Sequence, residues 1–151
     1  MLGDLTESQM EALLGSETVA RLGCYGNGDV YVVPITFAYE NGSVYGHTHD
    51  GLKVQMMRAH PRVCLEVDRI EDMAHWQSVI AWGIFEELKG EAAAHAIGLL
   101  VERFRPLLLS ATALPQHALT ALTRRRLDAH GHRAVIYRIV IDTMTGRYEH
   151  S

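Results

Sequence analysis

The chain has 151 residues, of which 48% are apolar and 21% are charged, and its formal net charge is −4 at pH 7. This length and composition predict a single domain, residues 1–151, with one hydrophobic core. The negative net charge argues against a nucleic-acid partner, which requires a strongly basic face. No apolar run approaches the roughly 20 residues of a membrane helix, and the start of the chain lacks the pattern of a signal peptide. We therefore expect a cytoplasmic protein without membrane contact.

The first half of the chain predicts a short helix and then an antiparallel meander. Thr6 and Gln9 form a capping box before MEALL, so a helix is expected to begin there. Three β-rich runs follow, at about residues 19–25, 30–39 and 43–48. The dipeptides Asn27-Gly28 and Asn41-Gly42 separate these runs, and Asn-Gly is a strong signal for a two-residue hairpin turn.

Pro34 lies in the middle of the second β-rich run. Proline has no N–H group to donate to the ladder of a central strand. Its position therefore predicts an edge strand, a bulge, or a place where the backbone turns toward a ligand.

The second half of the chain predicts three helices and three further strands. Residues 52–60 have apolar side chains at helical spacing and are followed by Pro61, which ends a helix. Strands are expected at 62–70, 76–88 and 134–149, and helices at 91–104 and 116–128. Six mostly antiparallel strands with inserted helices predict an α+β, mainly β fold: a closed or partly closed six-stranded barrel with flanking helices.

Both cysteines, Cys24 and Cys64, lie inside apolar runs. They lack the spacing of a zinc site or a disulfide framework. We expect both to be reduced residues of the core.

A polar stretch, HTHDGLK at residues 47–53, joins a predicted strand to a predicted helix. Lys53 lies in the first turn of that helix, where free N–H groups and the helix dipole favour an anion, and the Thr48 hydroxyl can donate beside it. A phosphate site and a solvated lysine near a turn fit these residues equally well, because the stretch is not a Walker motif.

The same stretch contains two histidines that a metal could use. His47 and His49 would point to the same side of a continuing strand, and His75 or Asp50 could supply a third ligand. No recognisable spacing fixes a third or fourth ligand, so no metal site is predicted.

The segment HWQSV, residues 75–79, opens another apolar strand. Gln77 and Ser78 could form hydrogen bonds to the edge of a planar heterocycle while Trp76 packs against it. By itself, the segment fits better an ordinary strand start whose tryptophan belongs to the core.

The order of these stretches is more specific than any one of them. The chain contains, in succession, YVVPITFAYENGSVYGHTHDGLKVQMMRAHPRVCLEVD, HWQSVIAWGIFEEL and YRIVIDTMTGR. This order resembles the pyridoxamine 5′-phosphate oxidase-like family of flavin-binding split barrels, especially its branch of nitroimidazole-resistance reductases. The resemblance covers residues 18–147 and implies a homodimer with two molecules of FMN at the subunit interface. Trp76 and Trp82 are candidates for that buried interface.

The resemblance also implies roles for individual residues. The backbone of one strand would line the isoalloxazine ring, at Val32, Val33, Pro34 and Ile35. In the HTHDGLK stretch, His47 and Thr48 would lie beside the phosphate and the ribityl chain, and Lys53 would bind the phosphate. Gln77 and Ser78 would approach the ring from a later strand. His47 is the one candidate for a residue near the reactive face.

Two departures from the family pattern bear on function. Family members usually have Arg-Lys where this chain has Leu52-Lys53, so one cation of the phosphate site is missing. The vitamin-forming oxidases end in a tail containing Arg-x-His, whereas this chain ends in TGRYEHS. We therefore do not expect oxidation of pyridoxamine phosphate.

Three functions follow from these patterns, in decreasing order of support. The first is an FMN-dependent oxidoreductase that passes electrons from NAD(P)H to a small acceptor such as a nitroaromatic or a quinone, with the redox chemistry supplied by the cofactor. The second is a flavin-binding or flavin-storage protein without turnover. The third is a haem-binding split barrel. The helix at 91–104, with His95, is expected to pack on the barrel and to carry no chemistry.

Overall fold

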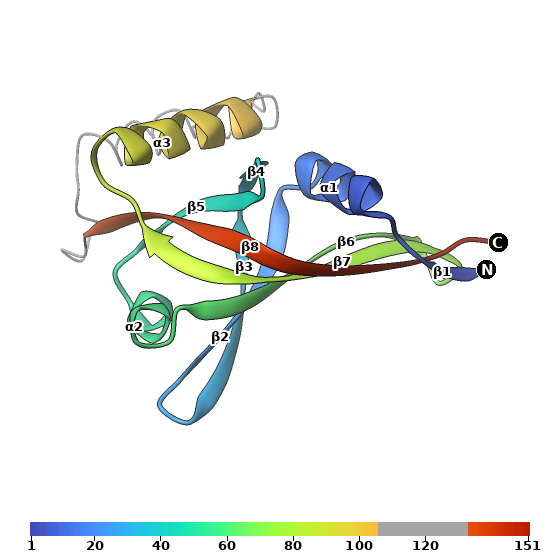
Figure 1. Cartoon of the computed structure of the whole chain (residues 1–151), viewed down its shortest axis with the longest axis horizontal. Helices are drawn as coiled ribbons and strands as arrows, with labels where there is room; N and C mark the ends of the chain where they lie inside the picture. The colour runs from blue at the N-terminus through green and yellow to red at the C-terminus, as the bar shows by residue number, and fades with distance from the viewer. Residues whose placement is uncertain (106–132) are drawn as a thin grey trace.

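The computed structural model describes residues 1–105 and 133–151, and the predicted helix at 116–128 lies outside them. Within the described residues there are three helices and eight strands (Figure 1). The helices are α1 (Glu7–Ser16), α2 (Leu52–Ala59) and α3 (Gly90–Phe104). The strands are β1 (Leu2–Asp4), β2 (Val19–Gly26), β3 (Asp29–Thr36), β4 (Ala38–Glu40), β5 (Ser43–His49), β6 (Arg62–Asp72), β7 (His75–Glu87) and β8 (Ala134–Glu149).

All eight strands belong to one antiparallel sheet in the order β3-β2-β6-β7-β8-β5-β4, with β1 paired to the far end of β8. The predicted mainly β, antiparallel class is confirmed, but the predicted count of six strands is wrong. The predicted strand at 30–39 is divided at Phe37, because β3 pairs with β2 whereas β4 pairs with β5. Strand β1 was not predicted, since its partner lies at the other end of the chain.

The predicted turns and helix start are confirmed. Asn27 and Gly28 both have positive φ angles, 53° and 78°, between β2 and β3, as a type I′ hairpin turn requires. Asn41-Gly42 has the same geometry between β4 and β5. At the start of α1, the Gln9 N–H donates to the Thr6 hydroxyl at 3.2 Å, and the Thr6 N–H donates to the Gln9 side-chain oxygen at 2.8 Å.

Strand β3 is an edge strand, which is one of the three possibilities that Pro34 predicted. It pairs with β2 on one side, and no described strand pairs with its other side. Pro34 lies opposite Arg21 in that pairing. The missing N–H group therefore costs the sheet no internal hydrogen bond.

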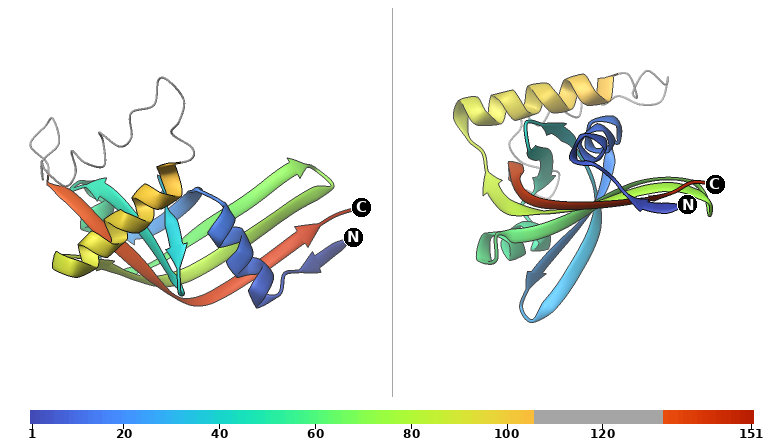
Figure 2. Two further views of the ribbon diagram at one scale, coloured as in Figure 1. Left: turned by 90° about the horizontal axis from the view of Figure 1, so that it is seen from above. Right: turned by 45° about the vertical axis from the view of Figure 1, so that its right-hand side comes forward.

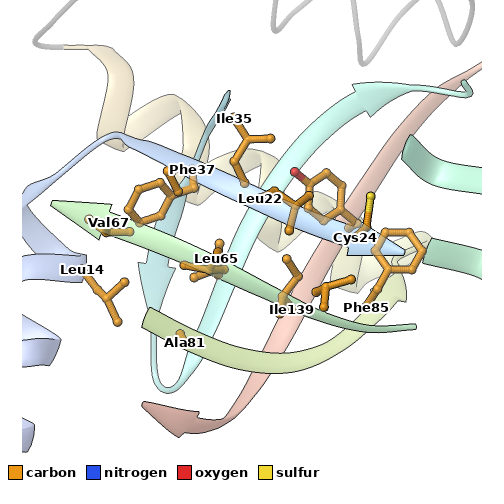
Figure 3. Packing of buried hydrophobic residues seen from close by; sticks show 14 of the residues in the cluster. Leu14, Leu22, Cys24, Ile35, Phe37, Leu65, Val67, Ala81, Phe85 and Ile139 are labelled. Atoms are coloured by element: carbon orange, nitrogen blue, oxygen red, sulfur yellow. The ribbon is translucent and has the colours of Figure 1, made fainter. Parts of the chain in front are cut away.

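The main core fills the concave side of the sheet. Leu22, Leu65 and Ala81 are cross-strand partners on β2, β6 and β7 and are at most 1% exposed. Figure 3 shows their side chains together with those of Cys24 and Ile139. Helices α1 and α2 add further apolar side chains to this cluster, namely Met10, Leu13 and Leu14, and Val54, Met56 and Met57.

The prediction that both cysteines belong to the core holds only for Cys24. Cys24 is 3% exposed and faces the main core. Cys64 is half-buried and lies on the opposite face of the sheet. The two positions differ because side chains alternate between faces along a strand.

Helix α3 packs on the other side of β4, β5 and β8, away from the main core (Figure 2). The hairpin formed by β6 and β7 extends from the barrel toward the chain termini, at the opposite end of the molecule from α2 (Figure 1). This arrangement separates the two regions in which the sequence predicts ligand contacts.

We expect Gly83→Ala to destabilise the fold by about 1–3 kcal/mol, the usual cost of forcing an extra group into a packed site. Gly83 follows a register shift in the pairing of β7 with β8. A Cβ atom at Gly83 would overlap the Val140 carbonyl oxygen and lie 2.8 Å from the carbonyl carbon. Because both atoms belong to the backbone, a side-chain rotation cannot relieve the overlap.

Gly98→Ala is the matched control, since a Cβ atom at this position in α3 would have no neighbour within 4 Å among the residues that the structure describes. There the substitution should stabilise the protein by up to about 1 kcal/mol through helix propensity. Urea denaturation of both variants gives the comparison. Equal free energies of unfolding would contradict the packing argument.

Candidate functional site

The loop between β5 and α2 is held by a network of ion pairs. Arg58, in the last turn of α2, donates to the Asp50 carboxylate at 3.0 Å and to the Glu87 carboxylate at 2.6 Å. These two carboxylates raise the pKa of the Arg58 guanidinium further above its usual range. The Asp50 N–H also donates to the Arg133 carbonyl oxygen at 2.9 Å. Asp50 therefore anchors the loop that presents the first turn of α2.

Lys53 occupies that first turn. Its side chain is half-buried, and it forms no ion pair and no hydrogen bond with any residue that the structure describes. Burial lowers the pKa of Lys53, and the nearby Cys24 thiol acts in the opposite direction. The N-cap, Gly51, supplies no side-chain hydrogen bond to the helix N–H groups. A partly desolvated ammonium thus lies beside uncapped backbone donors, which is a favourable arrangement for an anion.

His47 and Thr48 lie on opposite faces of β5. His47 shares a face with Tyr45, which packs against α3, whereas Thr48 shares a face with Val44 of the main core. Burial lowers the pKa of His47, and the neighbouring His49 and Lys53 lower it further. The lowered pKa of His47 favours the neutral imidazole, which can form hydrogen bonds and carries no charge of its own.

The four candidates on β3 also divide between two faces. Ile35 is buried in the main core and Val33 packs against it, whereas Val32 is 62% exposed and Pro34 is exposed. Cross-strand partners share a face, so the registers place two rows of residues on the exposed side. One row is Val32, Gly23, Cys64 and Trp82, and the next is Pro34, Arg21, Glu66 and Ile80. We call the convex surface formed by these eight residues and Ser78 the outer face.

Gln77 and Ser78 lie far from Lys53 within one chain. Gly26 lies against Met56 of α2, and Ser78 is seven residues further along the sheet and two strands across. At about 3.3 Å per residue and 4.8 Å per strand, Gly26 and Ser78 are roughly 20–25 Å apart. The structure thus brings Lys53, His47 and Thr48 together at one end of the barrel and leaves Gln77 and Ser78 at the other.

A polar cluster surrounds Ser78 on the outer face, and the sequence did not reveal it. The Ser78 hydroxyl donates to Glu66 Oε2 at 2.9 Å. Arg21 lies 3.3 Å from the Asp68 carboxylate and 3.7 Å from Glu66 Oε1. Burial and the neighbouring Asp68 carboxyl raise the pKa of Glu66. The alternating polar residues of RVCLEVDRI indicated the face, but only the strand register brings Glu66 to Ser78.

Two cavities lie near candidate residues. One of about 500 Å³ lies between α3, the end of α2 and the start of β8; Arg58, Lys89 and Arg133 line it, but none of the nine candidate residues does. A smaller one of about 180 Å³ lies beside the β6–β7 hairpin and is lined by Gln77, among other residues. Val135 and Ile136, the cross-strand partners of Thr48 and His47, line the larger cavity, so it lies beside these two candidates without including them.

No group of three or more His, Cys, Asp or Glu side chains in residues 1–105 and 133–151 could hold a metal ion. Asp50 is paired with Arg58, and His75 is paired with Asp72 at 2.8 Å. His95 lies 2.7 Å from Glu40 and contacts the ring of Tyr45, which fits the structural role predicted for it. In the described part of the chain, no helix is long and apolar enough to span a membrane.

Comparison with known proteins places these observations in a family. The family model described as pyridoxamine 5′-phosphate oxidase matches residues 6–148. A curated protein of Rhizobium meliloti, uncharacterised protein RA0666, is 28% identical over 91 residues, and the match spans 60% of each chain.

Two solved structures are similar over almost the whole chain. An FAD-binding protein from Mesorhizobium loti is 28% identical with a TM-score of 0.69, and the match covers 98% of each chain. A candidate 5-nitroimidazole antibiotic resistance protein from Bacteroides thetaiotaomicron is 18% identical with a TM-score of 0.71, and the match covers 98% of this chain and 87% of that one. At 18% identity, the second similarity concerns the fold alone.

Proposed function

Because the chain belongs to the pyridoxamine 5′-phosphate oxidase family, we propose that it is a flavin-dependent oxidoreductase whose cofactor is FMN. Its electrons would come from NADH or NADPH and pass to a small acceptor of the nitroaromatic or quinone type. The bound flavin supplies the hydride chemistry. The task of the chain is to hold the phosphate, to orient the ring and to shape the access of substrates.

The observation that carries this proposal is the environment of Lys53. A half-buried ammonium usually has a carboxylate partner, because its desolvation costs free energy. Lys53 has none among the described residues, and the first turn of α2 leaves N–H groups free beside it. A phosphate would satisfy both sets of donors. The donor set therefore fits the phosphate of a flavin nucleotide.

The proposal of FMN as the cofactor rests on the resemblance of the HTHDGLK stretch to the family pattern, since the charge of this site fits either flavin. The terminal phosphate of FMN carries between one and two negative charges near pH 7, whereas each bridging phosphate of FAD carries one. Leu52, which is 51% exposed, provides no second cation beside Lys53. The Mesorhizobium relative is described as FAD-binding, so FAD is the second candidate for the same position.

We further propose that two copies of the chain form a homodimer through the outer face and complete the site. The outer face presents exposed apolar side chains, with Val32 62% and Ile80 39% exposed. Such patches commonly mark interaction surfaces. A two-fold axis through this face would bring the β7 segment with Gln77 and Ser78 of one copy toward the Val32 strand and the Lys53 end of the other. Of the two β7 residues, Ser78 presents its side chain to the outer face and Gln77 presents its side chain to the opposite face.

Lys53→Met should weaken FMN by about ten-fold or more, and riboflavin, which has no phosphate, by less than two-fold. A charge-assisted hydrogen bond contributes about 1.5–3 kcal/mol. Leu52→Arg should tighten FMN by about ten-fold. Flavin fluorescence titrations with FMN, FAD and riboflavin measure these changes. Equal losses for FMN and riboflavin in Lys53→Met would show that Lys53 does not bind the phosphate.

The fold should tolerate the loss of Lys53. Because burial lowers the pKa of Lys53, carrying the ammonium charge costs the folded state free energy relative to the unfolded state at pH 7, and a neutral side chain removes this cost. The apoprotein of Lys53→Met should therefore unfold at the same or a higher denaturant concentration than the wild type.

Turnover separates an oxidoreductase from a storage protein. We expect the flavin-loaded protein to oxidise NADH or NADPH in the presence of a nitroaromatic or a quinone, and Lys53→Met to lose this activity as it loses FMN. Absorbance at 340 nm follows the reaction. Tight flavin binding without oxidation of either nucleotide, across a panel of acceptors, would favour the storage function.

A mixing experiment tests the shared site. Lys53→Glu and the double variant Gln77→Ala/Ser78→Ala should each bind FMN poorly alone. If each site uses Lys53 of one copy and Gln77 and Ser78 of the other, a mixed dimer regains one intact site. Unfolding and refolding the two variants together should then restore one site per mixed dimer, which is about half a site per dimer averaged over a statistical mixture. No recovery in verified mixed dimers would place all three residues in one chain's site.

A further inference from the structure

The Ser78 hydroxyl donates its hydrogen bond to Glu66. The distance from Ser78 Oγ to Glu66 Oε2 is 2.9 Å, and a hydroxyl has only one proton to donate. The remaining lone pairs of Ser78 Oγ can only accept a hydrogen bond. Ser78 therefore favours a ligand that presents an N–H or O–H group to the outer face.

Glu66 is held in the position that imposes this polarity. It is the cross-strand partner of Ile80, and the Asp68–Ser78 pair is the next row on the same face. Its second oxygen, Oε1, is buried, has no hydrogen-bond partner among the described residues, and lies 3.7 Å from Arg21. Arg21 also pairs with Asp68 at 3.3 Å. Residues on three strands thus keep Glu66 Oε2 directed at Ser78.

We propose that Glu66 is a positioning residue for cofactor recognition, because it makes Ser78 an obligate hydrogen-bond acceptor that selects a ring imide N–H. The pyrimidine edge of a flavin presents such an N–H between two carbonyl groups. Gln77, the preceding residue, shares the opposite face of β7 with Val79 and Ala81, so the recognition of the N–H at the outer face is assigned to Ser78 alone. This inference rests on the proposed flavin site and adds a residue that does not itself touch the ring.

The test compares FMN with N3-methyl-FMN, which lacks the imide N–H. Fluorescence titrations give the ratio of the two dissociation constants for each protein. The wild type should bind FMN at least ten-fold more tightly than the methylated analogue. In Ser78→Ala the ratio should fall below about three. In Glu66→Ala it should also fall, because the Ser78 hydroxyl is then free to rotate and donate to a carbonyl group.

Glu66→Gln is the matched control. The Gln amide group would direct its NH₂ toward the Asp68 carboxylate and its carbonyl oxygen toward Ser78, so the Ser78 proton keeps its acceptor. The ratio should therefore stay within about two-fold of the wild-type value. A merely structural role for Glu66 would change the affinity for both flavins equally and leave the ratio unchanged.

The outcomes separate this inference from the proposed function. A wild-type protein that binds both flavins equally well overturns the role of Glu66 and leaves flavin binding intact. A wild-type protein that binds neither overturns both. Loss of the dimer in Ser78→Ala, with an unchanged ratio, would overturn the role in flavin recognition and show that Ser78 accepts a hydrogen bond from the second copy.

Discussion

The alternation of side chains along the strands is the constraint on which the rest of this structure depends. Each strand must send every second side chain into the core, so the residues between them are left on the outer face. On β2 and β6 the inward residues include Leu22 and Leu65, which are fully buried. The outward residues include Arg21 and Glu66, which lie side by side. The sheet thus builds its core and its interaction surface from the same segments of sequence.

The two ends of the barrel differ in their electrostatics. At the α2 end, Arg58 is neutralised by Asp50 and Glu87, while Lys53 has no carboxylate partner within residues 1–105 and 133–151. At the hairpin end, carboxylates predominate around Ser78, and Arg21 compensates only part of their charge. In the proposed dimer, the phosphate of a flavin would lie at the α2 end of one copy and its ring at the hairpin end of the other.

Local signals in the sequence predicted much of the fold, because each acts over a few residues. The Asn27-Gly28 and Asn41-Gly42 turns, the Thr6 capping box and the edge position of Pro34 depend on backbone preferences that are complete within one segment. The failures are non-local. The division of one predicted strand at Phe37 and the existence of β1 are decided by pairing with strands elsewhere in the chain, which no local preference encodes.

The features of the candidate site are likewise partly local and partly non-local. The sequence by itself identified Lys53 as a cation at a helix start, since a strand, a loop with glycine and a helix follow one another in a single stretch. Only the tertiary structure decided that Lys53 has no carboxylate partner among the described residues, that Val32 and Pro34 face outward while Ile35 is buried, and that Glu66 holds the Ser78 hydroxyl. These features depend on strand register, and a shift of one residue would send each side chain to the opposite face. Register is set by the packing of the whole sheet, so the polarity of Ser78 could not be predicted from its own segment.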